Sequence, residues 1–382
     1  MTPGARAAAA IAVLEQILAG RPAEQALTNW GRANRYAGSG DRAAVRDIVF
    51  DVLRCRRSCA ALGGGASARA LVLGWARARG QDGLFDGQGH APSPPGPDEV
   101  GRRPEGAEAL DCPDWLEPVL RESLGADFAA VMAAMQRRAP VFLRVNLART
   151  TREAAVAALA EEGIGAVPHG LALSALEVVE GARKVQSSHA YAEGMVELQD
   201  AASQAVVEML PLSDGMTVLD LCAGGGGKTL AMAARARLRL FAHDAEARRM
   251  ADLPARAARA GVAVGLTDKP EKTAPYDLVL TDVPCSGSGS WRRDPEGKWA
   301  LTQVRLDALL ALQAGIMDRA AGMVRPGGVL GYATCSMIAA ENGAQVAAFL
   351  ARHDGWRLAA ERHFTPLEGG DGFYAAVLHR RD

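Results

Sequence analysis

Two cysteines in the second half of the chain have neighbours that suit covalent chemistry. Cys285 and Cys335 each follow a short apolar run, residues 277–281 and 329–333, that predicts a buried strand. Ligands and reacting groups in open α/β sheets gather at the carboxyl ends of the strands, which is where both thiols fall. Asp282, just before Cys285, adds a carboxyl group. The sequence therefore predicts a reaction site that holds two thiols and one acid.

A glycine-rich turn upstream has the form of a cofactor loop. Residues 218–221 predict a strand that runs into the turn CAGGGGKT at 222–229, and a helix is expected from about Leu230. Such a turn lets the backbone approach a ligand closely and directs free N–H groups at it. A second predicted strand, residues 238–242, leads to Asp244, the position at which such folds hold a ribose. Together these features predict a bound adenosine cofactor.

The same turn also imitates the phosphate loop of nucleotide hydrolases, because Gly226-Gly227-Lys228-Thr229 matches the end of that motif. The phosphate loop requires a glycine where this chain has Cys222. A nucleotide hydrolase also has no use for a Pro-Cys pair after Asp282. We therefore favour the adenosine cofactor.

Four segments carry a family resemblance. They are residues 219–229, residues 282–289, Thr334-Cys335-Ser336 with Glu341-Asn342 after it, and the closing residues 371–374. In this order they resemble the motifs of the RsmB/Nop/Sun RNA cytosine-5 methyltransferases. The chain departs from the family at Gly224-Gly225, where Ala-Pro is usual, and at Val283, where Ala is usual. Both are small backbone-shaping positions, so the departures concern cofactor affinity and leave the chemistry unchanged.

The resemblance implies an enzyme that transfers a methyl group from S-adenosyl-L-methionine to carbon 5 of a cytosine in RNA. Carbon 5 is a poor nucleophile, and a thiolate that adds to carbon 6 turns the ring into an enamine able to accept the methyl group. A base then removes the carbon-5 proton and the thiolate leaves. Asp282 is placed to protonate or hydrogen-bond nitrogen 3 of the ring.

The spacing leaves open which cysteine attacks. By the resemblance, Cys335 is the nucleophile and Cys285 helps to release the methylated product. The resemblance also implies an S-adenosyl-L-methionine pocket lined by Cys222, Ala223, Gly224, Gly225, Gly226, Gly227, Lys228, Asp244, Asp268 and Asp282. Lys228 either binds the cofactor or begins the helix. Asp220 is either functional or fixes the turn by hydrogen bonding.

The other cysteines and the histidines predict neither a metal site nor a disulfide framework. Cys55 and Cys59 share a predicted helix without a second pair nearby, and no histidine joins a cluster with metal-ligand spacing. We interpret Cys55, Cys59, Cys112 and the side chain of Cys222 as core groups. Unpaired cysteines are typical of a reducing compartment, and no apolar run approaches the ~20 residues of a membrane span. We therefore expect a cytoplasmic protein.

Charge is distributed unevenly along the chain. The net charge is −1, yet residues 1–80 contain twelve arginines, no lysine and five acids. Arginine suits phosphate groups and stacked bases, so this segment favours RNA as a partner. The alternative is that these arginines only cover solvated faces. Trp291-Arg292-Arg293, after the Cys285 loop, either contacts the substrate or forms a packed loop.

We predict an α/β protein of three parts. Residues 1–80 are helical, with Val45, Ile48, Val49, Val52 and Leu53 as an apolar stripe and Asp41 as its N-cap, and they resemble the NusB-like domain of RsmB-type family members. A flexible linker or long loop follows at 81–110. Residues 111–198 form a small α+β module that resembles an RNA-recognition module. The Rossmann-like class I methyltransferase domain covers 199–382.

The function that we predict is cytosine-5 methylation of RNA, with small-subunit rRNA as the partner and a monomer as the acting form. One alternative keeps the chemistry and acts on tRNA or another RNA. A second is a non-catalytic RNA-binding factor for ribosome assembly, which would have no need of Cys285, Cys335 and Asp282. In either enzyme, the target base must be unpaired or flipped out of its stack.

Overall fold

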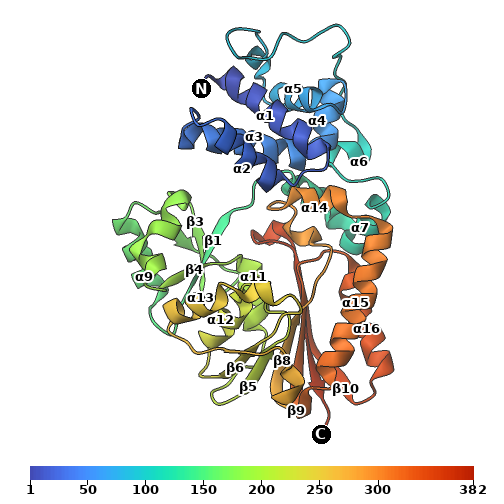
Figure 1. The fold of residues 1–382 in the computed structure, drawn as a ribbon. Helices are drawn as coiled ribbons and strands as arrows, with labels where there is room; N and C mark the ends of the chain where they lie inside the picture. The colour runs from blue at the N-terminus through green and yellow to red at the C-terminus, as the bar shows by residue number, and fades with distance from the viewer. The chain divides into compact units, whose positions relative to one another are not determined.

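The computed structural model describes all residues, 1–382, as two compact units (Figure 1). The helical unit comprises Met1–Arg138 together with Trp291–Ala300, and the sheet unit comprises Ala139–Ser290 together with Leu301–Asp382. The predicted domain boundaries stay a prediction, since the sheet unit contains both the small α+β module and the Rossmann-like part. None of the helices combines the length and the apolar composition needed to cross a membrane.

Five helices build the core of the helical unit. They are α1 (Pro3–Leu18), α2 (Ala23–Ala33), α3 (Ser39–Arg54), α4 (Arg56–Gly63) and α5 (Ala68–Arg77). The predicted stripe on α3 is confirmed, because all five of its residues are buried against α1 and α5. After a long loop come the shorter helices α6 (Gly106–Ala109), α7 (Glu117–Leu124) and α8 (Phe128–Met135).

The predicted N-cap of α3 is wrong. The helix begins at Ser39 with Gly38 as its N-cap, and Asp41 lies inside the first turn. An acid in a first turn is still favourable for the helix dipole. The Asp41 side chain accepts a hydrogen bond from Nε of Arg6 at 2.9 Å, so it joins α3 to α1.

The segment Trp291–Ala300, which includes α14 (Pro295–Ala300), closes the end of α3. Lys298 donates to the carbonyl oxygen of Arg54 at 3.1 Å, and Trp299 donates to that of Leu53 at 2.7 Å. These carbonyls belong to the last helical turn, which has no partners within the helix. Trp291 is only 2% exposed, so the structure supports the packed-loop alternative for this segment.

The small sheet of the sheet unit is antiparallel, in the order β2-β3-β1-β4. Its strands are β1 (Val141–Val145), β2 (Ala166–Pro168), β3 (Ala175–Val178) and β4 (Val196–Leu198), with α9 (Arg152–Glu161) and α10 (His189–Ala192) beside them. This mixture of strands and helices agrees with the α+β module predicted for this part of the chain, and the Thr151 side chain caps α9.

The large sheet has the order β10-β11-β9-β8-β5-β6-β7. The parallel strands are β5 (Thr217–Asp220), β6 (Arg239–Ala242), β7 (Gly265–Leu266), β8 (Tyr276–Asp282) and β9 (Val324–Thr334); β10 (Trp356–Phe364) and β11 (Phe373–Arg380) complete the edge in antiparallel pairing. The strand order reverses between β5 and β8, where α/β sheets bind ligands. The predicted Rossmann-like fold is confirmed.

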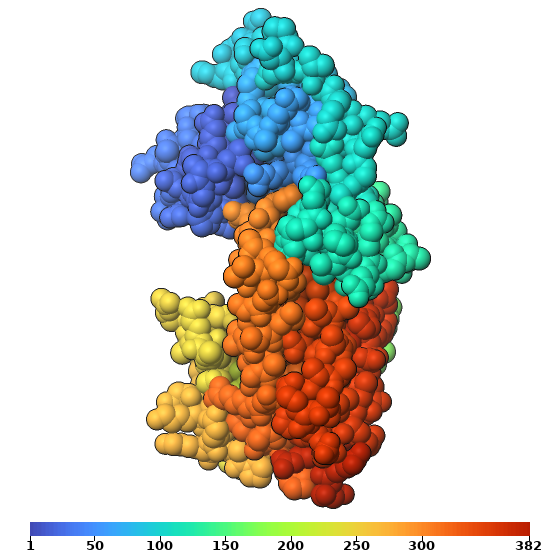
Figure 2. All heavy atoms as spheres, turned by 90° about the vertical axis from the view of Figure 1, so that its right-hand side faces the viewer, coloured from blue at the N-terminus to red at the C-terminus, as the bar shows by residue number.

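Helices cover both faces of this sheet (Figure 1). Helices α11 (Ala201–Glu208) and α12 (Gly227–Ala233) pack on one face, and α15 (Gln303–Ala321) and α16 (Gly343–Arg352) pack on the other, which Figure 2 shows from outside in orange to red. Alternate strand residues point to opposite faces of the sheet. Val218 and Leu278 pack with α11 and α12, and Leu219 and Val279 pack with α15 and α16. The period of two follows from the strand pleat.

Candidate active site

A cavity of about 540 Å³ opens at the carboxyl ends of β5, β8 and β9. It brings together most of the predicted site residues, namely Cys222, Ala223, Gly224, Gly225, Gly227, Lys228, Asp282, Cys285 and Cys335. Further lining residues come from Asp220, from Gln199 and Ser203 near the start of α11, and from Arg305 on α15. The fold therefore places the two thiols, the acid and the glycine turn around one space.

Three of the predicted cofactor residues do not line this cavity, and one of the three lines a neighbouring cavity. Asp244, which is 6% exposed, lines a second cavity of about 500 Å³ that shares Cys222, Arg249 and Pro284 with the first. This second cavity is largely apolar, with Leu312 and Ile316 of α15 in its wall. Gly226 and Asp268 line neither cavity.

The two thiols are in contact. The Sγ atoms of Cys285 and Cys335 lie 3.3 Å apart. The hydrogen bond with Cys335 raises the pKa of Cys285 well above its ordinary value, and burial adds to the effect. Cys285 is therefore a thiol at neutral pH, and either sulfur of the pair can donate its S–H to the other.

A buried carboxylate joins the two cysteine loops. Oε1 of Glu341 accepts from the backbone N–H of Ser286 at 2.8 Å and from Nε2 of Gln313 at 2.9 Å. Oε2 accepts from the hydroxyls of Ser286 and Ser336, each at 2.5 Å. The sequence signalled Glu341 only as part of a motif, and nothing in the spacing indicated this role or that of Gln313.

Lys228, which is buried, forms an ion pair with the half-buried Asp282. Nζ of Lys228 lies 2.8 Å from Oδ2 of Asp282, and Nζ also lies 4.9 Å from the centre of the Phe373 ring. Burial acts to lower the pKa of Lys228, but the Asp282 carboxylate outweighs burial and the pKa lies above its ordinary value. Lys228 is therefore a fixed positive charge, and it holds the glycine turn to the end of β8.

Asp220 ends β5 at full burial. Its Oδ2 accepts from the Thr229 hydroxyl at 2.6 Å, so Asp220 fixes the turn, which is one of the two roles predicted for it. Its Oδ1 has no hydrogen-bond partner. Burial raises the pKa of Asp220 to about 7. An unpartnered buried oxygen beside a cavity fits a ligand that brings a donor.

The glycine turn needs its glycines at two positions. Gly224 and Gly226 have φ of +49° and +80°, a region that side chains disfavour. A Cβ on Gly226 would come within 2.2 Å of Cδ1 of Leu253. The Gly224 N–H donates to Oδ2 of Asp244 at 2.9 Å, so the turn and the end of β6 are held together.

The remaining four cysteines are thiols that keep their protons at neutral pH. Burial raises the pKa of Cys55 to about 12 and of Cys112 to about 11, and it raises the pKa values of Cys59 and Cys222 as well. The chain contains no group of three or more His, Cys, Asp or Glu side chains placed to hold a metal ion.

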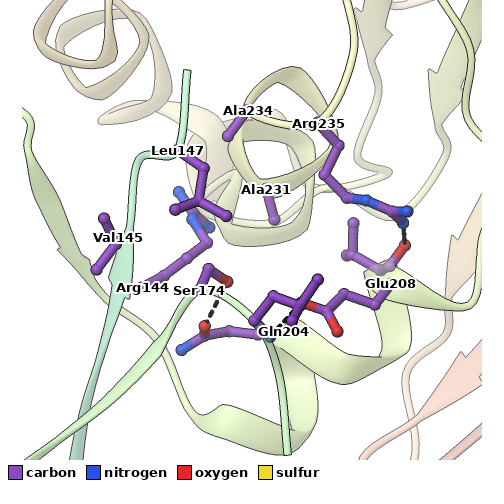
Figure 3. Close-up of a pocket in the computed structure, with 11 residues that line it drawn as sticks. Arg144, Val145, Leu147, Ser174, Gln204, Glu208, Ala231, Ala234 and Arg235 are labelled. Carbon is purple, nitrogen blue, oxygen red and sulfur yellow. Dashed lines mark hydrogen bonds between the residues drawn. The ribbon is translucent and has the colours of Figure 1, made fainter. Parts of the chain in front are cut away.

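The sequence also gave no sign of a buried arginine that contacts the glycine turn. Arg144 on β1 is 4% exposed, and its Nη1 donates to Oε1 of Gln199 at 2.5 Å and to the carbonyl oxygen of Gly227 at 2.6 Å. Figure 3 shows Arg144 at a small cavity of about 170 Å³, with Ser174 and Gln204 on one side and Ala231 on the other. The small sheet is thereby fixed to the turn that carries Lys228.

Comparison with known proteins identifies the family of the two domains of the sheet unit. Residues 207–379 match the family model "16S rRNA methyltransferase RsmB/F", and residues 112–186 match "Methyltr_RsmF/B-like, ferredoxin-like domain". The chain is 33% identical over 282 residues to the ribosomal RNA small subunit methyltransferase B of Serratia proteamaculans, and 36% identical over 284 residues to that of Vibrio cholerae. These alignments cover 70% of this chain and 66% and 65% of the two relatives, just under two thirds of their length.

Solved structures show the same fold. The crystal structure of PH0851 matches with a TM-score of 0.78 at 22% identity and covers 100% of this chain and 99% of that one. The structure of NSun6 from Pyrococcus horikoshii with SFG matches with a TM-score of 0.62 at 18% identity, covering 71% and 98%. The resemblance seen in the motifs is confirmed: by its catalytic domain and the ferredoxin-like domain before it, the chain belongs to the RsmB/F family.

Proposed function

We propose that the protein transfers a methyl group from S-adenosyl-L-methionine to carbon 5 of a cytosine in RNA, with small-subunit rRNA as the substrate. The observation that carries this proposal is the contact of Cys285 and Cys335 at 3.3 Å beside Asp282 in one cavity. The names of the relatives, which are ribosomal RNA small subunit methyltransferases, support the choice of RNA.

The residues around the two cavities fit the cofactor. Asp244 at the end of β6 is the acid expected to hold ribose hydroxyls, and the apolar wall with Leu312 and Ile316 suits an adenine ring. The glycine turn, with Asp220 Oδ1 lacking a donor, would hold the amino acid part. When bound, S-adenosyl-L-methionine supplies an electrophilic methyl group.

The sulfur of Cys335 is proposed to attack carbon 6 of the ring. Its thiolate would be stabilised by the S–H of Cys285 and by the positive charge of Lys228, which acts electrostatically on Cys335. The choice of Cys335 rather than Cys285 as the nucleophile rests on the family resemblance.

Asp282 and Cys285 take the remaining roles. Asp282 is proposed to hydrogen-bond the ring at nitrogen 3 while Lys228 holds the carboxyl group in place. After a base removes the carbon-5 proton, the bond between carbon 6 and the Cys335 sulfur breaks. Sγ of Cys285 lies 3.3 Å from that sulfur, so it is placed to assist release.

The test is methyl transfer from labelled S-adenosyl-L-methionine to unmodified small-subunit rRNA and, in parallel, to tRNA. We expect 5-methylcytosine in the rRNA with the wild type and none with Cys335→Ala, which should still bind the cofactor. Label in tRNA alone would mean that tRNA, and not small-subunit rRNA, is the substrate. Transfer that persists in Cys335→Ala would exclude Cys335 as the nucleophile.

A further inference from the structure

Strand pairing alone does not fix the separation of the two thiols. The last paired residues of β8 and β9 are Asp282 and Ala333, and both cysteines lie beyond them on loops. A covalent mechanism with one attacking and one assisting thiol requires a constant separation. The backbone supplies one link between the loops, from the Gly289 N–H to the carbonyl oxygen of Cys335 at 2.9 Å, and side chains must supply the rest.

Glu341 is placed to do this. Its carboxylate binds the residue that follows each cysteine, Ser286 after Cys285 and Ser336 after Cys335. Ser336 also accepts from the N–H of Ile338 at 3.0 Å, and its hydroxyl lies 3.0 Å from that of Ser288. Hydrogen bonds to a charged acceptor are roughly twice as strong as neutral ones.

Glu341 does not reach the reaction space. It is fully buried and is absent from the cavity wall, so it does not touch a substrate there. A buried carboxylate is costly unless donors surround it, and this one has four. We infer that Glu341 is a positioning residue that sets the separation of Cys285 and Cys335 by binding both of their loops. Its importance for turnover rests on the proposed function.

Two substitutions separate hydrogen bonding from bulk. Glu341→Leu keeps a similar volume and accepts no hydrogen bond. Glu341→Gln can still accept from Ser286 N–H and Gln313 through its oxygen, while its amino group donates to the two serine hydroxyls, which can rotate to accept. The matched control is Glu361→Leu, because Glu361 on β10 accepts only from the Tyr374 hydroxyl and lies outside the network.

The separation is measured by the rate at which diamide, an azo oxidant, couples the two thiols. Both hydrogens and two electrons pass to the azo nitrogens, which become a hydrazine, and an S–S bond forms between the sulfurs. The peptide that joins Cys285 to Cys335 is quantified by mass spectrometry after alkylation of free thiols. We expect wild type, Glu361→Leu and Glu341→Gln to react at similar rates, and folded Glu341→Leu to react about tenfold more slowly, the factor that one lost hydrogen bond corresponds to. In methyl transfer, kcat should fall while the cofactor KM stays constant.

A wild-type oxidation rate in folded Glu341→Leu would overturn the inference. If that variant does not fold, the double variant Ser286→Ala/Ser336→Ala removes both hydroxyls and keeps the carboxylate with Gln313. An unchanged oxidation rate in it would overturn the inference equally. Oxidation needs neither RNA nor cofactor, so a wild type that oxidises as expected but transfers no methyl group would refute the proposed function alone.

A separate observation concerns the arginines of the helical unit. Of the twelve within residues 1–80, six form ion pairs with acids, namely Arg6, Arg46, Arg54, Arg57, Arg69 and Arg79. Arg32 and Arg35, at the turn from α2 to α3, are exposed and have no partner. Arg42 lies against the same turn, where its Nε donates to the carbonyl oxygen of Ala37. Positive charge is therefore left unpaired at the turn from α2 to α3, residues 32–42, which we call the corner.

The corner also carries Tyr36, which is 74% exposed and is the only exposed tyrosine, tryptophan or phenylalanine of the chain. The next acid along the chain, Asp41, is already paired with Arg6. An open aromatic face among free arginines is the arrangement that binds single-stranded nucleic acid by stacking and phosphate contacts. We propose that Tyr36 stacks on an unpaired base of the RNA and that Arg32 and Arg35 contact its phosphates. The identity of this RNA as the substrate rests on the proposed function.

Binding of a short labelled single-stranded RNA of mixed sequence, without cofactor, tests the corner. We expect Arg32→Gln/Arg35→Gln to weaken binding and to lower the salt dependence by about 0.7 for each lost phosphate contact. Tyr36→Ala should weaken binding about tenfold with an unchanged salt dependence, since stacking is not ionic. Arg46→Gln, which breaks a pair with Glu24 in the same unit, is the matched control and should change little. Equal affinities for all of these proteins would overturn this proposal without bearing on methyl transfer.

Discussion

The ion pair of Lys228 and Asp282, with 2.8 Å between Nζ and Oδ2, connects the two halves of the candidate active site. Lys228 belongs to the glycine turn after β5, and Asp282 ends β8 just before the Cys285 loop. One contact thus joins the part that would hold the cofactor to the part that would hold the target base. The strand order reverses between these two strands, which is why the pair lies in the ligand crevice.

Breaking this pair should cost both stability and activity. Lys228→Met keeps the aliphatic stem and leaves the partly exposed Asp282 carboxylate without its cation, which we expect to lower the free energy of unfolding by roughly 2 kcal/mol, between the values for an exposed and a buried pair. Turnover should fall because Asp282 is no longer held toward the ring. Urea unfolding and methyl transfer measure the two effects. The exposed pair of Arg237 and Asp214 is the control, and Arg237→Met should change stability by less than about 1 kcal/mol. Equal small losses in both variants would contradict this account.

Removing the thiol of Cys285 should trap the reaction. With Cys285→Ala, Cys335 can still attack, but the thiol that contacts its sulfur is gone, so we expect a covalent protein–RNA adduct that survives denaturation. Denaturing electrophoresis with labelled RNA detects the adduct. The double variant Cys285→Ala/Cys335→Ala should form none. Normal turnover of Cys285→Ala without an adduct would remove Cys285 from the release step.

The candidate site could be predicted because its parts are local. The turn from β5 to α12, the acid at the end of β8 and both cysteines each lie next to an apolar strand, and parallel strands bring such positions to one edge. What escaped prediction depends on partners distant in the chain. Glu341 acts on Ser286, and Arg144 acts on the carbonyl of Gly227, and no local pattern encodes either pairing.

The same distinction holds for the fold. The stripe from Val45 to Leu53 follows helical periodicity and is buried as expected. The N-cap at Asp41 was wrong because the helix already begins at Ser39, and the Asp41 side chain bonds to Arg6 on another helix. The packing of Trp291–Ala300 with α3 joins residues more than two hundred positions apart, such as Arg54 and Arg292, so sequence spacing gave no signal for it.

Asp220 should make the stability of the protein depend on pH. Burial raises its pKa from the ordinary 3.8 to about 7. At low pH the acid is protonated in both the folded and the unfolded chain. As the pH rises from about 4 to 7, only the unfolded chain releases the proton, so the folded state loses stability by up to about 1.4 kcal/mol per pH unit. Asp220→Asn stays neutral and keeps an acceptor for Thr229. Its unfolding free energy should therefore equal that of the wild type near pH 4 and exceed it increasingly up to pH 7. A constant difference across this range would show that Asp220 does not titrate as its burial implies.

Gly226 offers the sharpest test of the glycine turn, because the chain contains a matched control. Gly226 and Gly215 have similar φ values, +80° and +85°, so an alanine at either position meets the same backbone strain of about 1 kcal/mol. At Gly215 a Cβ meets nothing within 4 Å, whereas at Gly226 it would lie 2.2 Å from Cδ1 of Leu253. Gly215→Ala should therefore lower stability slightly and leave cofactor binding intact. Gly226→Ala must move the turn or Leu253, and we expect it to lose measurable binding of S-adenosyl-L-methionine in calorimetry. Equal cofactor affinities in the two variants would mean that the shape of this turn does not govern cofactor binding.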